Sequence, residues 1–190
     1  MTLFNFRRRK SVETMLAELA KLGIRLSPGI EPDELLADFS REAIEKSGFE
    51  MLLVAMGSPN ASFSSDVWHF DAEAIEDHGS YVDLAEHCVR LANPDLSFVR
   101  ISDHVEVDEG EAWIEYENGS GVERVILAVD DDWVDPAFFD DLDKRLESRG
   151  SKRRFWAHVL GQDSLIICQP ESSIGSINRT SGLKFGSLRL

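Results

Sequence analysis

The chain has 190 residues, 43% of them hydrophobic and 29% charged, and its 35 acidic residues against 20 Lys and Arg give a formal net charge of −15. This composition is typical of a globular protein and excludes collagen-like, disulfide-scaffold and wholly disordered chains. No apolar run approaches the ~20 residues of a membrane span. Because no secretory signal opens the chain and Cys88 and Cys168 stand 80 positions apart, we expect a cytoplasmic protein with reduced thiols.

The charge is unevenly distributed along the chain. Residues 1–10 and 151–190 each carry a net charge of +4, whereas residues 101–150 hold 16 acids and 4 bases. An acidic field of this size repels phosphates, so we expect no direct binding to nucleic acid. The same field attracts a basic protein and speeds its association.

The first half of the chain predicts helices and one buried strand. Residues 11–22 have apolar side chains at helical spacing, with Ser11 as a cap. Pro32 opens a second helix that we expect to run to Gly48. The nearly continuous apolar run over 49–56 predicts a buried strand, and residues 67–70 predict a short one.

The second half alternates between helical and strand periodicity. Residues 80–92 predict a third helix, and residues 98–129 change to a period of two, with a hairpin at Asn118-Gly119. Asp135-Pro136 opens a fourth helix. The residues after this helix predict a strand over 153–159, an interior strand over 164–168, a short helix after Pro170 and an extended segment over 183–185.

These elements predict the α+β class, with a single domain over residues 11–190. We expect a mainly antiparallel sheet with about four to five helices packed on it. Residues 1–10 form a basic, flexible N-terminal segment in this interpretation, and a weak sub-boundary lies near residues 149–154, where the sign of the charge changes.

The leading functional hypothesis is a non-enzymatic module that binds a basic protein, in the manner of an immunity or inhibitor protein of a toxin or nuclease. No nucleophile motif or glycine-rich phosphate loop is present, so we expect no cofactor. Aromatic residues among acids on an exposed strand and the following turn are candidate contact residues. They are Glu111, Trp113, Glu115, Glu117, Asp130, Asp131, Asp132 and Trp133.

Two alternatives remain open. Asp130 and Asp132, with His69, could hold a divalent metal in a small hydrolase or transferase, because carboxylates at a strand end suit hard cations. Residues 3–10 place apolar side chains before a basic cluster, which could attach a regulatory or scaffold domain weakly to an anionic membrane. His87 is expected on the exposed face of its helix, and His158 shares a strand face with Arg154 and Trp156.

Overall fold

The computed structural model describes residues 9–59, 63–119 and 121–188 and has the predicted α+β class, with two antiparallel sheets instead of one. Its helices in these ranges are seven, more than expected: α1 (Val12–Lys21), α2 (Pro32–Asp38), α3 (Arg41–Ser47), α4 (Phe49–Met56), α5 (Ser80–Ala92), α6 (Ala137–Ser148) and α7 (Glu171–Ser181). The strands are β1 (Val67–Asp71), β2 (Arg100–Glu106), β3 (Glu111–Asn118), β4 (Gly121–Leu127), β5 (Arg153–Val159), β6 (Asp163–Pro170) and β7 (Gly186–Ser187).

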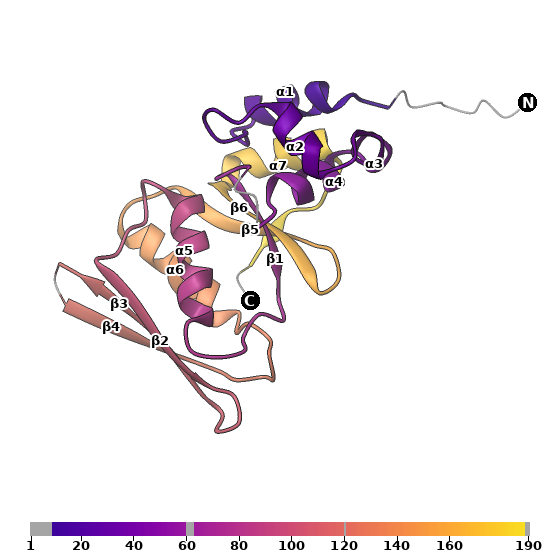
Figure 1. The fold of residues 1–190 in the computed structure, drawn as a ribbon. Coiled ribbons are helices and arrows are strands. Elements are labelled where there is room, and N and C mark those ends of the chain that lie inside the picture. The colour runs from indigo at the N-terminus through magenta and orange to yellow at the C-terminus, as the bar shows by residue number, and fades with distance from the viewer. Residues whose placement is uncertain (1–8, 60–62, 120, 189–190) are drawn as a thin grey trace, which may run out of the picture.

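The elements form four layers (Figure 1). The first layer contains α1 to α4 and α7, and it covers one face of a four-stranded sheet with the order β1-β6-β5-β7. Helices α5 and α6 lie on the other face of that sheet. A three-stranded sheet with the order β2-β3-β4 covers the far side of these two helices and leaves its own outer face without a further layer.

Two hydrophobic clusters hold the layers together, one on each face of the four-stranded sheet. Strand β6 shows the division, because Leu165 and Ile167 belong to the cluster beneath the first layer, whereas Ile166 and Cys168 belong to the cluster around α5 and α6. Side chains alternate across a strand, so an interior strand that is apolar on both faces serves two cores. The prediction that β6 is an interior strand is confirmed.

The prediction of a strand at Phe49–Met56 is wrong, because this segment is α4. Five of its eight residues are buried, so helical periodicity is hidden, and a short apolar run does not distinguish a buried strand from a buried helix. The single helix predicted over residues 32–48 is also wrong. Phe39 is extended, and the Ser40 hydroxyl accepts a hydrogen bond from the Ala43 N–H to begin α3.

The helix predicted at residues 80–92, the helix predicted after Asp135-Pro136 and the predicted hairpin are confirmed. The hairpin at Asn118-Gly119 joins β3 to β4. The sub-boundary at residues 149–154 covers the connection between α6 and β5 and stays a prediction. Arg9 and Lys10 are the only part of the basic N-terminal segment that the structure describes, and Lys10 pairs with Glu18 at 2.5 Å. Within the described ranges, none of the helices combines the length and apolar character that crossing a bilayer requires.

Candidate functional site

Three acidic loops meet at the end of the molecule that carries the three-stranded sheet. We call residues 71–79, 106–111 and 128–136 the acidic end; they contain twelve Asp and Glu and no Lys or Arg. The first and third loops pair through their backbones, since the Ile75 N–H donates to the Asp132 carbonyl and the Val134 N–H to the Ala72 carbonyl, both at 2.9 Å. His78 joins the first loop to the second, because its Nε2 lies 3.7 Å from a Glu106 carboxylate oxygen.

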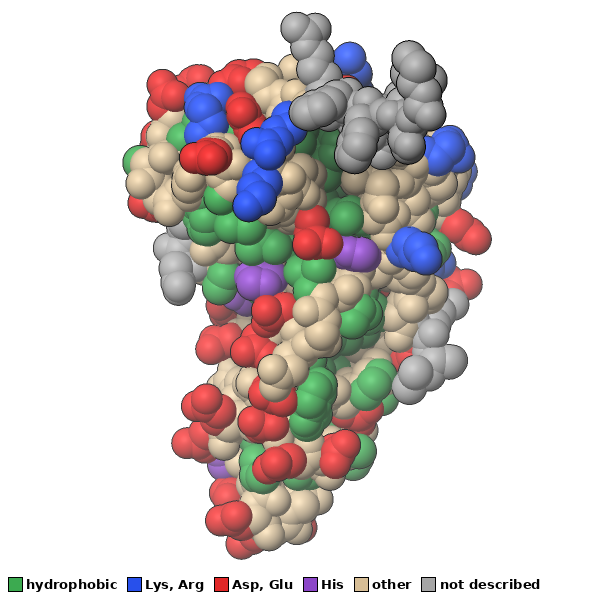
Figure 2. All heavy atoms as spheres, turned by 90° about the vertical axis from the view of Figure 1, so that its right-hand side faces the viewer, with side chains coloured by type: hydrophobic (Ala, Val, Ile, Leu, Met, Phe, Trp, Pro, Cys, Tyr) green, Lys and Arg blue, Asp and Glu red, His purple; other side chains and the backbone are tan. Residues whose placement is uncertain are grey.

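Charge is unevenly distributed over the face of the protein that Figure 2 shows. In Figure 2 the Lys and Arg side chains lie over the upper part, where Figure 1 places α1 and α4, and the lower part of this face shows Asp and Glu. On this face, the Lys and Arg side chains are therefore separate from the acids of the lower part. Such a field steers a basic partner toward one end of the molecule.

The predicted turn at residues 130–133 lies within the acidic end. Asp131 is in the left-handed region with φ 54°, and both Asp130 and Asp131 are exposed. The Trp133 N–H donates to the Asp130 carbonyl at 3.1 Å, and the Trp133 side chain is 41% exposed. Asp135 has a structural role, because its carboxylate accepts hydrogen bonds from the Ala128 and Ala137 N–H groups.

The predicted strand residues lie on the outer face of β3, as their alternation predicted, but two of the acids are neutralised there. Arg124 binds Glu115 at 2.7 Å and lies 3.9 Å from the centre of the Trp113 ring, and Arg100 pairs with Glu117 at 3.1 Å. Glu111 is exposed. The uncompensated part of the predicted site is therefore Glu111 with the turn at 130–133.

Exposed apolar side chains collect near the three-stranded sheet. Among the described residues, five large hydrophobic side chains are exposed, and four of them lie on this sheet or the loops beside it. These four are Val99, Val122, Ile126 and Trp133. Apolar surface rimmed by charged residues is typical of protein interaction sites.

A hollow of about 480 Å³ adjoins the acidic end, between β1 and α5. Four carboxylates line it, and no Lys or Arg is found among the described residues of its wall. Asp71 and Glu76 belong also to the acidic end, whereas Asp83 and Asp163 come from α5 and β6. A concave site with several carboxylates and apolar walls suits the long stem and the cationic head of a Lys or Arg side chain.

The two histidines of this hollow are held by neighbours. His69 Nε2 lies 3.5 Å from an Asp163 oxygen. The prediction of an exposed His87 is wrong, because its ring stacks on Trp68 at 4.6 Å, and its Nδ1 lies 2.7 Å from Arg90. Burial, followed by the charge of Arg90, lowers the pKa of His87. His87 is therefore part of the wall, stabilised by stacking.

The residues predicted to bind metal do not form a ligand group in the described ranges. There, one set of three His, Cys, Asp or Glu side chains places its ligand atoms within 4.8 Å of one another, and it consists of His78, His104 and Glu106. This set was not predicted from the sequence, although His104-x-Glu106 on a strand places both side chains on one face. The contribution of His78 depends on the tertiary structure.

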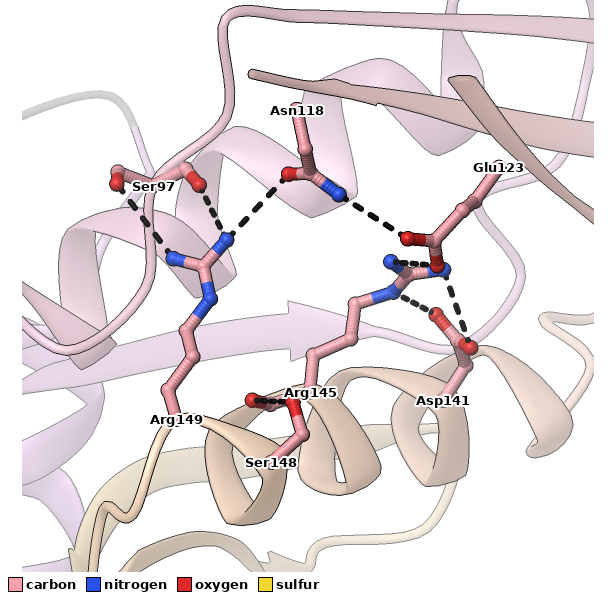
Figure 3. Close-up of polar contacts among 7 residues, drawn as sticks. All are labelled: Ser97, Asn118, Glu123, Asp141, Arg145, Ser148 and Arg149. Carbon is pink, nitrogen blue, oxygen red and sulfur yellow. Dashed lines mark hydrogen bonds and ion pairs between the residues drawn. The ribbon is translucent and has the colours of Figure 1, made fainter. Parts of the chain in front are cut away.

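An ion-pair network holds the three-stranded sheet on α6 (Figure 3). Arg145, whose side chain is 11% exposed, binds Asp141 at 2.5 Å and Glu123 at 2.8 Å. Burial lowers the pKa of Arg145, but hydrogen bonds and charge from these two carboxylates outweigh it and raise the pKa overall. Arg149 extends the network, donating to the Ser97 carbonyl at 2.8 Å.

The other predicted features are placed as follows. His158 lies 3.7 Å from Glu50 of α4, which shows that the strand face it shares with Arg154 and Trp156 is partly covered by the first layer. Cys88 and Cys168 are free and buried, and burial raises the pKa of both thiols. Of the residues 3–10 proposed for membrane contact, 3–8 lie outside the described residues.

Comparison with protein-family models, with curated proteins and with solved structures finds no match to this chain.

Proposed function

We propose that the protein is a non-catalytic binding module that engages a basic protein through its acidic end. The carboxylate-lined hollow beside that end carries this proposal, because it combines four acids with apolar walls and has no cation in its described wall. A Lys or Arg side chain of the partner enters the hollow, and the acidic end supplies the field that orients the approach.

Trp133 and the exposed apolar side chains of the three-stranded sheet supply the second part of the interface. Charge alone gives fast association, but desolvated aromatic anchors dominate the affinity of most interfaces. Trp133 is half-exposed next to Asp130 and Asp131, so a partner that reaches the turn also covers the indole ring. Glu111 and the outer face of β3 lie at the rim of this surface.

An immunity or inhibitor protein of a basic toxin or nuclease is the specific version of the proposal. Such a protein would cover the nucleic-acid site of its target by presenting carboxylates in place of phosphates. The buried, free thiols of Cys88 and Cys168 are consistent with action in the cytoplasm.

The test is capture of partners from the native cell lysate at low and high salt, read by mass spectrometry, with charge-matched variants. The first variant is Asp130→Asn/Asp131→Asn/Asp132→Asn, in which Asn tolerates the left-handed backbone at position 131. Its control, Asp33→Asn/Asp38→Asn/Glu42→Gln, removes the same charge from exposed acids of α2 and α3.

We expect the wild type and the control to retain one basic protein at low salt, and the turn variant to lose at least tenfold in affinity. A second pair, Trp133→Ala against Val159→Ala, compares two exposed apolar side chains, one in the acidic end and one on β5 outside it. Equal losses in the turn variant and the control, or no effect of Trp133→Ala, would refute the assignment of this surface.

A further inference from the structure

We infer that His78, His104 and Glu106 form a binding site for a divalent transition-metal ion, with zinc as the best match. The ligand atoms of the three side chains lie within 4.8 Å of one another. Two imidazoles and one carboxylate are a ligand set that zinc takes in proteins, with a fourth position left for water or a partner's side chain. This site goes beyond the proposed binding function and does not depend on it.

The three ligands come from two segments that the fold fixes against each other. His104 and Glu106 are two positions apart on β2 and so point to the same, outer face of the sheet. His78 belongs to the loop before α5. The next residue, Gly79, has φ 98° and donates its N–H to an Asp103 carboxylate oxygen at 2.7 Å.

Asp103, the residue directly before His104, connects these segments because it points inward from β2. Its second carboxylate oxygen accepts a hydrogen bond from the Val82 N–H at 3.1 Å, so it binds the first turn of α5. The backbone next to His78 is therefore tied to the residue that precedes His104. A site positioned in this way needs only side-chain rotation to close on an ion.

The side chains around the ligands have the features of an outer coordination shell. An Asp77 oxygen lies 3.1 Å from His78 Nδ1, which leaves Nε2 on the side of Glu106. A metal-bound imidazole usually donates its other N–H to such a carboxylate. The His104 ring stacks on Trp113, with 5.4 Å between centroids and 14° between planes, which restricts its orientation.

Electrostatics also favours a cation at this position. Glu106 pairs across the strands with Glu111, which places two like charges opposite each other at the end of the sheet. With Asp77 beside His78, three carboxylates lie around the two imidazoles, and the acidic end has no Lys or Arg. A divalent ion would relieve this repulsion, and His nitrogen ligands select zinc over magnesium or calcium.

The experiment is isothermal titration calorimetry of the full, tag-free chain with zinc chloride, compared with magnesium chloride. We expect one zinc ion per chain and no comparable binding of magnesium. His78→Ala and Glu106→Gln should each weaken zinc binding at least tenfold, and Asp77→Ala should weaken it by about tenfold through the loss of the outer carboxylate.

His69→Ala is the matched control, because His69 also lies beside a carboxylate but belongs to no set of three ligands among the described residues. It should bind zinc within twofold of the wild type. Circular dichroism and melting curves check that each variant is folded, and His78 and Glu106 are exposed enough for their truncation to be tolerated. In NMR spectra of the wild type, the ring signals of His78 and His104 should shift with zinc while those of His158 stay.

Absence of zinc binding at millimolar concentration would overturn the assignment. So would a site that survives the His78→Ala/Glu106→Gln double variant, or one that His69→Ala abolishes equally. Loss of partner capture in the turn variant with unchanged zinc binding would show that the two sites are independent.

Discussion

Replacing Gly57 with alanine tests the contact between α4 and β1, which no sequence pattern predicted. Gly57 ends α4 with φ −88° and ψ 3°, a conformation open to any residue. Its carbonyl oxygen accepts a hydrogen bond from the His69 N–H at 2.8 Å. A Cβ at this position would lie 2.6 Å from the His69 nitrogen and 2.9 Å from the Trp68 carbonyl carbon.

The expected sign of the effect depends on this contact. If the backbone alone mattered, Gly57→Ala would stabilise the protein by about 0.4–1 kcal/mol, because alanine reduces the entropy of the unfolded chain. The added methyl group instead presses on the backbone of β1, which cannot rotate away. Overpacking of a core costs about 1–3 kcal/mol. Contact with two backbone atoms points to the upper limit, which lowers Tm by about 6–12 °C for a chain of this length.

Gly175→Ala is the matched control. Gly175 lies inside α7, and a Cβ there would meet only the end of the Arg179 side chain, at 3.4 Å. Alanine is favoured over glycine in a helix interior by about 1 kcal/mol. We therefore expect opposite shifts of Tm and of the urea midpoint in the two variants. A Gly57→Ala protein as stable as the wild type would refute the close approach of α4 to β1.

Two further predictions concern buried polar groups. Arg145→Ala should lower the free energy of unfolding, measured by urea titration, by about 1–3 kcal/mol, because it leaves the half-buried Asp141 carboxylate without its partner. The control Arg100→Ala removes one side of an exposed ion pair and should change this free energy by less than about 0.5 kcal/mol. The two tyrosines of the chain, Tyr81 and Tyr116, are buried, and burial raises the pKa of Tyr81 to about 12 and that of Tyr116 further. Both folded pKa values exceed the unfolded value of about 10. The contribution of the two neutral tyrosines to the free energy of unfolding is therefore complete below pH ~10 and is lost as the pH rises above it. Ultraviolet titration should show tyrosinate only as the chain unfolds, and titration of either tyrosine near pH 10 in the folded protein would contradict the burial.

Local structure followed from sequence at several elements that expose one face to solvent. The helix at residues 80–92 and the strand at 111–118 each alternate between buried and exposed side chains with the period of their backbone, so the pattern identifies them. The same reasoning placed Trp113 on the outer face of its strand. It failed at α4, because a helix buried on nearly all sides has no polar face to reveal its period.

The chemistry of the site was predicted less completely. The sequence located the excess of acid over residues 101–150 and the Asp130–Asp132 turn. It did not show that Glu115 and Glu117 are paired with Arg124 and Arg100, because the pairing depends on the register between neighbouring strands.

The sequence by itself determined the composition of the surface, the turns and most of the elements, because these depend on residues close together in the chain. The tertiary structure alone decided that residues 71–79 and 128–136 pair into one acidic end and that Asp163 reaches the hollow beside it. It also brought His78 to His104 and Glu106, across an intervening helix. Contacts between distant segments follow from how the layers pack, and packing depends on the shapes of all the buried side chains together.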